Sequence, residues 1–382
     1  MKKQLLIDSS FFKELDSSNL SLELYTGRLL QGFRNSDVFE VSAIVWRGFE
    51  SRIDELAGYE VPKIIIDGHH YVTPWPVVDR LLGLVSSDLI KELQKRNVDI
   101  VLVPYSFLCR LFFPKRFHQH VIVHDLDLYS YIKDRWGMCK YLLWRNYHHL
   151  LLHKVSNYIS ISEATRQELK RLDGIDSTIV HNSIPFDFTI MEEPVKEVEG
   201  RPYILDVNRF SKNKNTGTLI RAFSLLKKRI PHYLYLKGDN YYQIDELQDL
   251  AKMLDVGDRV IFDRTFRTES EMRYLYAHAD LFVSPSLVEG FGWTPIEAAI
   301  MKVPVMVSDV DVLKEVTCEK VPTFDPYSPE DLAEKMLTIL KNPPSRESRE
   351  ELSRFYQEKY SLKRQIDSMT DLFLQNLKAK HR

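Results

Sequence analysis

Short runs of apolar residues recur along the chain, and segments long enough to form a helix separate most of them. Runs of this kind, bounded by polar or turn-forming residues, are typical of buried strands. Strands that alternate with helices indicate parallel sheets with both faces covered, and hence an α/β protein with doubly wound domains. In the first half this pattern predicts strands at Gln4–Ile7, Lys63–Ile66, Ile100–Val103, Val121–Val123, Tyr158–Ile161 and Thr178–Val180. In the second half it predicts strands at Tyr203–Val207, Tyr233–Lys237, Val260–Phe262, Leu281–Val283 and Val303–Val307.

The two sets of strands indicate two domains. The chain has 382 residues, which is long for one hydrophobic core. An acidic segment that contains proline lies between the two sets and is interpreted as a linker. We therefore expect a first Rossmann-like domain at 1–184, a linker at 185–201 and a second Rossmann-like domain at 202–345. Residues 346–382 are expected to form C-terminal helices.

The composition is that of an ordinary globular protein, with 44% hydrophobic and 28% charged residues. A net charge of −2 gives no reason to expect a nucleic acid partner. Three widely spaced cysteines fit a reducing compartment and neither a disulfide framework nor a metal site. The apolar start at Leu5–Ile7 is too short for a signal peptide, and no run approaches the ~18 apolar residues of a membrane span. A cytoplasmic protein is expected.

Two glutamates, Glu289 and Glu297, lie eight positions apart around a bend that contains two glycines. A predicted strand precedes the bend, and the glycines permit a tight turn and close approach of a ligand to the backbone. Thr294 and Pro295 are expected to be the N-cap and the first residue of the following helix. A strand, a bend and a helix N-terminus together form a place where an anion can bind free N–H groups.

This E-x7-E spacing resembles that of the retaining nucleotide-sugar glycosyltransferases of glycosyltransferase family 4, which have the GT-B fold. The surrounding segments of the second half are similar to the family's strands, basic loop and helix, at 206–210, 212–215, 219–223, 304–308, 313–316 and 324–326. Segments of the first half resemble its N-terminal landmarks, at 123–125, 159–163 and 180–184. The resemblance spans nearly the whole chain. It implies two Rossmann-like domains with a cleft between them, and a last helix, near Leu362–Leu377, that crosses back to the N-terminal domain.

The resemblance implies a hexosyltransferase. Such an enzyme moves a hexose from a nucleoside diphosphate sugar to a saccharide or lipid-linked saccharide acceptor, with retention at the anomeric carbon, in cell-surface polysaccharide or glycan synthesis. Residues 123–125, Val-His-Asp, resemble the mannosyl- and rhamnosyltransferase branches, which favours GDP-mannose or a deoxyhexose donor. Two alternatives stay open: a sugar-nucleotide-binding subunit without turnover, and a GT-B epimerase that acts on the donor sugar.

Arg209 and Lys214 lie in a loop after a predicted strand, where ligands of open α/β sheets bind. Two cations there would stabilise the charge that develops on a departing diphosphate, although a solvated basic loop is the alternative. The resemblance places Glu289 beside the transferred sugar as a catalytic residue. It places the backbone of Phe291 and Gly292 next to the sugar and the phosphates.

Glu297 has two interpretations. The sequence Thr294–Glu297 fits a capping box, in which the glutamate returns to the backbone N–H of the N-cap residue. The resemblance instead assigns Glu297 to the ribose hydroxyls of the donor. Both roles are compatible, because a carboxylate has two oxygens.

His124 follows a predicted strand, a position in which an isolated histidine is more often structural. The resemblance places it near the donor sugar, as a second catalytic residue. Two pairs of aspartates, Asp125 with Asp127 and Asp309 with Asp311, look like the metal motif of another glycosyltransferase fold. Since cations and a helix N-terminus already face the phosphates, we expect no metal and no other cofactor.

Two features concern the acceptor side. The loop at 16–21 lacks the glycines that this family usually has after its first strand. Peripheral contact with the inner face of a membrane is considered for 107–120, which is basic and aromatic, and for 135–154. The apolar face of the second segment fits a domain core better than a lipid contact.

Overall fold

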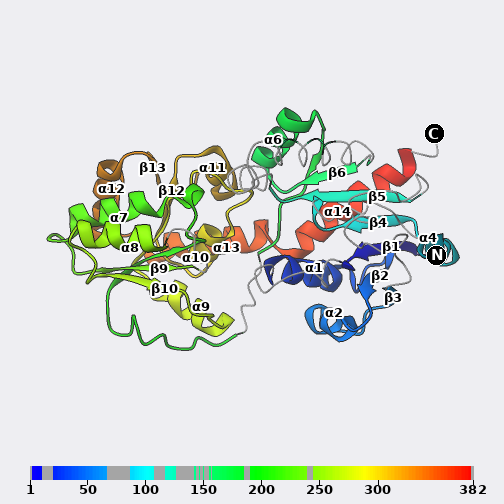
Figure 1. Ribbon diagram of the computed structural model, residues 1–382, viewed down its shortest axis with the longest axis horizontal. Helices are drawn as coiled ribbons and strands as arrows, with labels where there is room; N and C mark the ends of the chain where they lie inside the picture. The colour runs from blue at the N-terminus through cyan, green and yellow to red at the C-terminus, as the bar shows by residue number, and fades with distance from the viewer. Residues whose placement is uncertain are drawn as a thin grey trace. The chain divides into compact units, whose positions relative to one another are not determined.

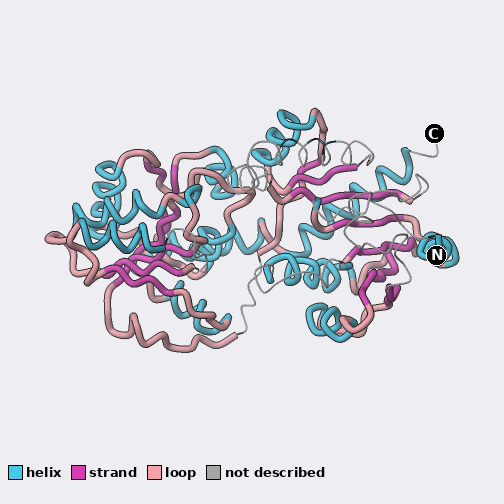
Figure 2. Tube along the Cα trace, viewed as in Figure 1, coloured by secondary structure: helices cyan, strands magenta, loops and turns pink. Residues whose placement is uncertain are grey.

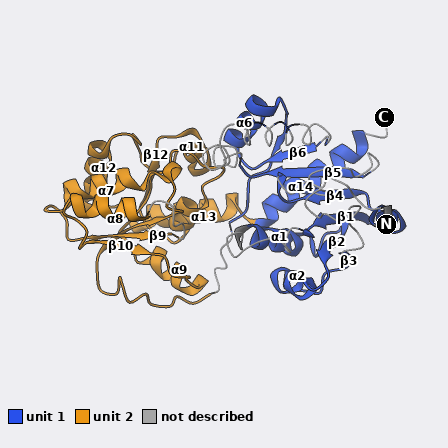
Figure 3. Ribbon diagram, in the orientation of Figure 1, with its two compact units in different colours: residues 1–185, 362–382 blue, residues 186–361 orange. Residues whose placement is uncertain are grey.

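The computed structural model describes residues 2–10, 20–66, 87–106, 117–125, 157–184, 190–238 and 244–379, with positions 142, 146, 149 and 155. The chain folds into two compact units, residues 1–185 with 362–382, and residues 186–361 (Figure 3). Each unit has one parallel sheet with helices packed around it (Figures 1 and 2). The predicted α/β class with two doubly wound domains is confirmed.

The sheet of unit 1 has its topological switch point between β1 and β4, because the chain builds outward from β1 in one direction and then in the other. Its seven described strands follow the order β3-β2-β1-β4-β5-β6-β7, and every pairing is parallel. The strands are β1 (Lys3–Asp8), β2 (Phe39–Trp46), β3 (Lys63–Ile66), β4 (Ile100–Val103), β5 (His118–Val123), β6 (Asn157–Ser160) and β7 (Thr178–Ile179). The helices whose bounds lie within the described residues are α1 (Leu20–Phe33), α2 (Glu50–Ala57), α4 (Ser87–Lys95), α6 (Glu163–Asp173) and α14 (Leu362–Ala379).

Unit 2 repeats this arrangement, with its switch point between β8 and β11. Its six described strands follow the order β10-β9-β8-β11-β12-β13. They are β8 (Tyr203–Val207), β9 (Tyr233–Lys237), β10 (Val260–Asp263), β11 (Leu281–Ser284), β12 (Val305–Ser308) and β13 (Thr323–Phe324). The helices are α7 (Thr216–Leu226), α8 (Ile244–Met253), α9 (Glu269–Ala277), α10 (Trp293–Ile300), α11 (Asp311–Thr317), α12 (Pro329–Lys341) and α13 (Arg346–Lys359). Ligands of such sheets bind beyond the carboxyl ends of the strands at the switch point.

The final helix, α14, belongs to unit 1, although the residues before it belong to unit 2 (Figure 3). Its Phe373 is fully buried and stacks on Phe33 of α1 with the ring centroids 6.2 Å apart. The same ring meets Phe39 of β2 edge-on at 5.9 Å. The last turns of the chain therefore complete the core of the first unit.

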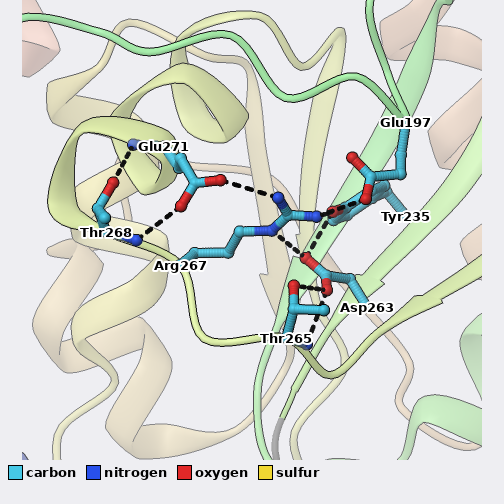
Figure 4. Close-up of polar contacts among 7 residues, drawn as sticks. All are labelled: Glu197, Tyr235, Asp263, Thr265, Arg267, Thr268 and Glu271. Carbon is cyan, nitrogen blue, oxygen red and sulfur yellow. Dashed lines mark hydrogen bonds and ion pairs between the residues drawn. The ribbon is translucent and has the colours of Figure 1, made fainter.

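The segment expected to be a linker differs from the prediction. Its described residues belong to unit 2, where Val195 and Val198 are buried. Glu197 pairs with Arg267 at 2.8 Å, and Arg267 also pairs with Asp263 at 2.8 Å and Glu271 at 2.9 Å (Figure 4). Two buried valines and a shared arginine thus hold an acidic segment against the domain that follows it.

Candidate functional site

The basic loop of unit 2 follows β8 as the sequence predicts. Residues Lys212–Lys214 form one 3-10 turn, and α7 begins at Thr216. The side chain of Lys214 is only 15% exposed. Arg209 is exposed and forms no ion pair within the described part of the chain. The structure therefore holds one of the two predicted cations in place and leaves the other in solvent.

Lys214 meets Glu289, which lies beyond the end of the adjacent strand β11. The distance between Lys214 Nζ and Glu289 Oε1 is 2.6 Å, and the glutamate side chain is 16% exposed. Ser286 Oγ donates to the same carboxylate oxygen at 2.8 Å. The N–H of Leu287 donates to the carbonyl of Asn213 at 2.8 Å, so the two loops are also joined through the backbone. Two residues that are 75 positions apart in sequence (289 − 214) thus form one fixed charge pair at the switch point.

A third ionisable group at this site, Asp206, is not among the residues predicted from the sequence. It is a buried residue of β8, and burial raises the pKa of its carboxyl to about 7. The side-chain amide of Asn208 and the charge of Lys214 act in the opposite direction, whereas Glu289 adds to the rise. A carboxylate inside an otherwise apolar strand is costly unless it has a specific purpose, and this was the available sequence signal.

The helix after the bend begins earlier than predicted, and the capping-box interpretation of Glu297 is wrong. Gly292 is the N-cap residue, with φ of 89°, and Trp293 is the first helical residue. Glu297 therefore lies beyond the first turn and cannot cap it. Its Oε2 accepts a hydrogen bond from Tyr276 Oη at 2.7 Å. Because burial raises the pKa of Tyr276 well above its usual range, this hydroxyl keeps its proton and orients the carboxylate.

Phe291 and Gly292 have structural roles that restrict how they can meet a ligand. The Phe291 ring is buried and packs edge-on against Tyr360 at 5.5 Å. A Cβ atom on Gly292 would lie 2.7 Å from Leu313 Cδ2. The Phe291 side chain is therefore committed to packing, and no side chain fits at position 292.

His124, the candidate in unit 1, lies directly after β5 and is 6% exposed. Its Nε2 lies 2.9 Å from the carbonyl oxygen of Pro104. Since a carbonyl only accepts, Nε2 carries the proton and Nδ1 is the acceptor of the ring. Burial lowers the pKa of His124 to about 4, so the ring is neutral at physiological pH. The Tyr25 ring packs edge-on against it at 4.7 Å.

The second aspartate pair is engaged by a lysine. Lys314 Nζ lies 2.8 Å from Asp309 and 3.3 Å from Asp311. No group of three or more potential metal ligands occurs among the described residues. Asp127 lies outside the described residues, as do 16–19 of the first loop, 107–116, and most of 135–154. Within the described part of the chain, no helix is both long and apolar enough to cross a membrane.

Most of unit 2 matches a known protein family. Residues 187–358 match the family described as glycosyl transferases group 1. The chain carries a glycosyltransferase domain. The matched region contains Lys214, Glu289 and Glu297, and its family agrees with the enzyme class expected from the sequence.

The curated relatives are distant and mostly longer. The chain is 26% identical over 223 residues to the serotype-specific mannosyltransferase WbdA of Escherichia coli, covering 52% of this chain and 27% of that protein. It is 25% identical over 203 residues to the O-antigen chain mannosyltransferase RfbU of Salmonella typhimurium, covering 52% of this chain and 54% of that protein. The chain thus spans about a quarter to a half of the length of the first curated relatives that it matches.

Solved structures match nearly the whole chain. Sucrose-phosphate synthase from Thermosynechococcus elongatus has a TM-score of 0.70 at 17% identity, covering 99% of this chain and 100% of that one. Anabaena HepE in complex with UDP has a TM-score of 0.69 at 16% identity, covering 98% and 100%. At these identities the likeness concerns the fold alone, and it confirms the predicted GT-B architecture.

Proposed function

We propose that the protein is a retaining hexosyltransferase of glycosyltransferase family 4 that uses a nucleoside diphosphate sugar. The ion pair between Lys214 and Glu289 carries this proposal, because it lies at the switch point of the unit that matches the glycosyltransferase family. Relatives described as a serotype-specific mannosyltransferase and an O-antigen chain mannosyltransferase favour a mannose-type donor such as GDP-mannose. The acceptor is then a saccharide, free or lipid-linked, of a cell-surface polysaccharide.

The proposed donor site uses four groups of unit 2. Lys214, aided by the exposed Arg209, neutralises the diphosphate, where negative charge grows as the glycosidic bond breaks. Glu289 faces the positive charge that develops at the anomeric carbon. Glu297, oriented by Tyr276, accepts hydrogen bonds from the ribose hydroxyls.

The proposed transfer needs no nucleophile from the protein. The bond between the anomeric carbon and the phosphate oxygen breaks, and the acceptor oxygen bonds to the same face of the sugar. The proton of the acceptor hydroxyl passes to the departing phosphate oxygen. His124 assists by accepting a hydrogen bond from a hydroxyl of the donor sugar at Nδ1, since its Nε2–H is already engaged by Pro104. Exclusion of water from the site favours the saccharide over hydrolysis.

We further propose that transfer is independent of divalent metal ions. Lys214 supplies the positive charge that a metal would provide to the diphosphate. Lys314 already pairs with both Asp309 and Asp311, so a metal at that position would have to displace it. A cytoplasmic location, with peripheral contact to the inner membrane face, is part of the same proposal.

The decisive experiment is a donor screen that measures release of nucleoside diphosphate, with and without saccharide acceptors, before and after exhaustive chelation. We expect release from one donor, faster with an acceptor and unchanged by chelation. No release from any donor would favour the subunit without turnover, and an isomerised donor would favour the epimerase. Activity lost on chelation and restored by Mn²⁺ would contradict metal independence.

A further inference from the structure

The chain crosses between the two units at two places, after residue 185 and after residue 361 (Figure 3). On the side of unit 1, Ser183 lies just before the first crossing, and Gln365 lies just after the second, in the first turn of α14. The N–H of Ser183 donates to Gln365 Oε1 at 3.2 Å, although the two residues are 182 positions apart. One hydrogen bond therefore joins the segment by which the chain leaves unit 1 to the helix by which it returns.

Gln365 is a polar residue on the buried face of α14, where it is 4% exposed. The other residues that this helix buries are apolar: Ile366, Met369, Leu372, Phe373 and Leu377. The Nε2 of Gln365 donates to Tyr25 Oη of α1 at 3.0 Å. Since the N–H of Ser183 can only donate, the amide oxygen of Gln365 faces Ser183 and its NH₂ group faces Tyr25. Burying an amide is costly unless both of its ends have a partner, and here both ends have one.

Tyr25 connects this amide to His124. The Tyr25 side chain is 4% exposed, and its ring meets the imidazole edge-on, with the ring centroids 4.7 Å apart and an angle of 86° between the planes. Aromatic pairs favour this edge-to-face arrangement. The hydrogen bond to Pro104 fixes one atom of the imidazole, Nε2. The plane of the ring, and with it the direction of Nδ1, needs a second contact, which Tyr25 provides.

We propose that Gln365 is a positioning residue for His124, because it fixes Tyr25 against the imidazole and so sets the direction of Nδ1. This inference rests on the proposed function, since it concerns the histidine that would contact the donor sugar. Gln365 touches neither substrate nor the reacting atoms. It acts through Tyr25, and its own orientation is set by the N–H of Ser183.

Asn376 provides a matched control on the same helix. Its Nδ2 lies 2.9 Å from Nε2 of His120, a fully buried residue of β5. Nδ1 of His120 lies 3.2 Å from the carbonyl oxygen of His118, so Nδ1 carries the proton and Nε2 accepts from Asn376. Asn376 thus uses the same kind of amide to hold a buried histidine of unit 1 that has no place in the proposed transfer.

The test combines NMR of the imidazole rings with kinetics of the full chain, with GDP-mannose as the donor. Gln365→Met keeps the length of the side chain and removes both hydrogen bonds. We expect it to shift the ring signals of His124, to lower kcat/KM about tenfold, and to leave the dissociation constant of GDP unchanged. Tyr25→Phe keeps the ring, removes the hydroxyl and should have a similar effect. Asn376→Leu should shift the signals of His120 alone and leave kcat/KM unchanged.

Two further variants separate positioning from stability, which melting temperatures report. In a His124→Ala background, Gln365→Met should cause no further loss of kcat/KM, because Gln365 acts through the imidazole. Gln365→Glu keeps an acceptor for the N–H of Ser183 and for the hydroxyl of Tyr25. It should therefore retain more of kcat/KM than Gln365→Met does, even though a buried carboxylate lowers the melting temperature.

Unchanged His124 signals in a folded Gln365→Met variant would overturn the proposal. An equal loss of kcat/KM in Asn376→Leu, or an undiminished effect of Gln365→Met in the His124→Ala background, would overturn it as well. The proposed function fails by a different readout, the absence of nucleoside diphosphate release from every donor, whereas the ring signals need no turnover. A shift of the His124 signals in Gln365→Met without any such release would support the link between these residues and contradict the transferase.

Discussion

At the scale of single residues, the affinity of the candidate donor site for a diphosphate depends on the net charge of its own side chains. Lys214 and Glu289 neutralise each other, and both are largely buried. Asp206 would add a negative charge if it were ionised, but burial raises the pKa of its carboxyl to about 7. When Asp206 is protonated, the three groups sum to zero and an incoming diphosphate meets no net repulsion. The protonation state of this residue therefore bears on donor affinity.

The first prediction is that donor affinity decreases as Asp206 ionises. Its pKa is raised in the fold, so the protonated form persists up to about pH 7, and a bound diphosphate favours that form. The dissociation constant of the nucleoside diphosphate should rise between pH 6 and pH 8 in the parent. In Asp206→Asn, titration calorimetry should give a flatter profile, and the difference between the two proteins removes the titration of the nucleotide itself. Identical profiles would exclude Asp206 as the titrating group.

A second prediction ranks the basic residues of the loop. Lys214→Ala should weaken nucleoside diphosphate binding by roughly 1.5–3 kcal/mol, the range for hydrogen bonds to charged groups, because it also leaves Glu289 unpaired. Arg209→Ala should have a smaller effect, since solvent screens an exposed charge. Lys212, which is exposed in the same 3-10 turn, is the control and should tolerate alanine. An effect at Lys212 equal to that at Lys214 would indicate a general surface charge and no specific site.

The two glutamates should fail in different kinetic parameters, which is the third prediction. Glu289→Gln should mainly lower kcat, because its interaction grows as positive charge develops in the transition state. Glu297→Gln should mainly raise the donor KM, because ribose is held equally in the ground and transition states. Tyr276→Phe removes the hydrogen bond that orients Glu297 and should raise the donor KM as well. The assignment of Glu297 is wrong if neither of these two variants changes that KM.

At the scale of elements, the sequence predicts most strands because their apolar runs are continuous. The predicted ends of β8 and β9 agree with the structure. β2 has no counterpart among the predicted strands, because Glu40 and Ser42 interrupt its apolar residues. The start of α10 was predicted two residues too late. Local capping rules favour Thr294, whereas the N-cap residue is Gly292, whose left-handed conformation a glycine adopts readily.

The fourth prediction concerns this glycine. Gly292→Ala places a Cβ in a left-handed backbone conformation and 2.7 Å from Leu313 Cδ2, so the free energy of unfolding should fall by roughly 1–3 kcal/mol. Gly200 is the matched control, because its φ is 69° and a Cβ there meets no atom within 4 Å. Gly200→Ala should show the backbone effect alone, about 1 kcal/mol. Denaturant unfolding of both variants separates strain from steric overlap, and equal losses would show that Leu313 moves aside freely.

At the scale of the whole molecule, the sequence indicates two domains but does not determine which distant residues meet. Lys214 and Glu289 come together only because β8 and β11 are neighbours at the switch point, and strand order is not visible in a periodic pattern. The predicted linker differs for a related reason. Its acidic composition suggested solvent, whereas Glu197 meets an arginine 70 positions further along the chain.

The last prediction follows from the separate cores of the two units. Phe373→Ala removes a fully buried ring that packs on Phe33, Phe39 and His120, so unit 1 should lose roughly 3–5 kcal/mol of stability. Scanning calorimetry with and without nucleoside diphosphate identifies the transition of unit 2, since a ligand raises the melting temperature of the unit that binds it. Phe373→Ala should lower the other transition and leave nucleotide affinity unchanged.

Phe223→Ala is the corresponding control for unit 2, because Phe223 is as fully buried in the core of that unit as Phe373 is in unit 1. It should lower the transition that nucleotide raises. These results would show that α14 stabilises unit 1 independently of the nucleotide site in unit 2. A single transition that both variants lower together would contradict this, because it would mean that the two cores unfold as one.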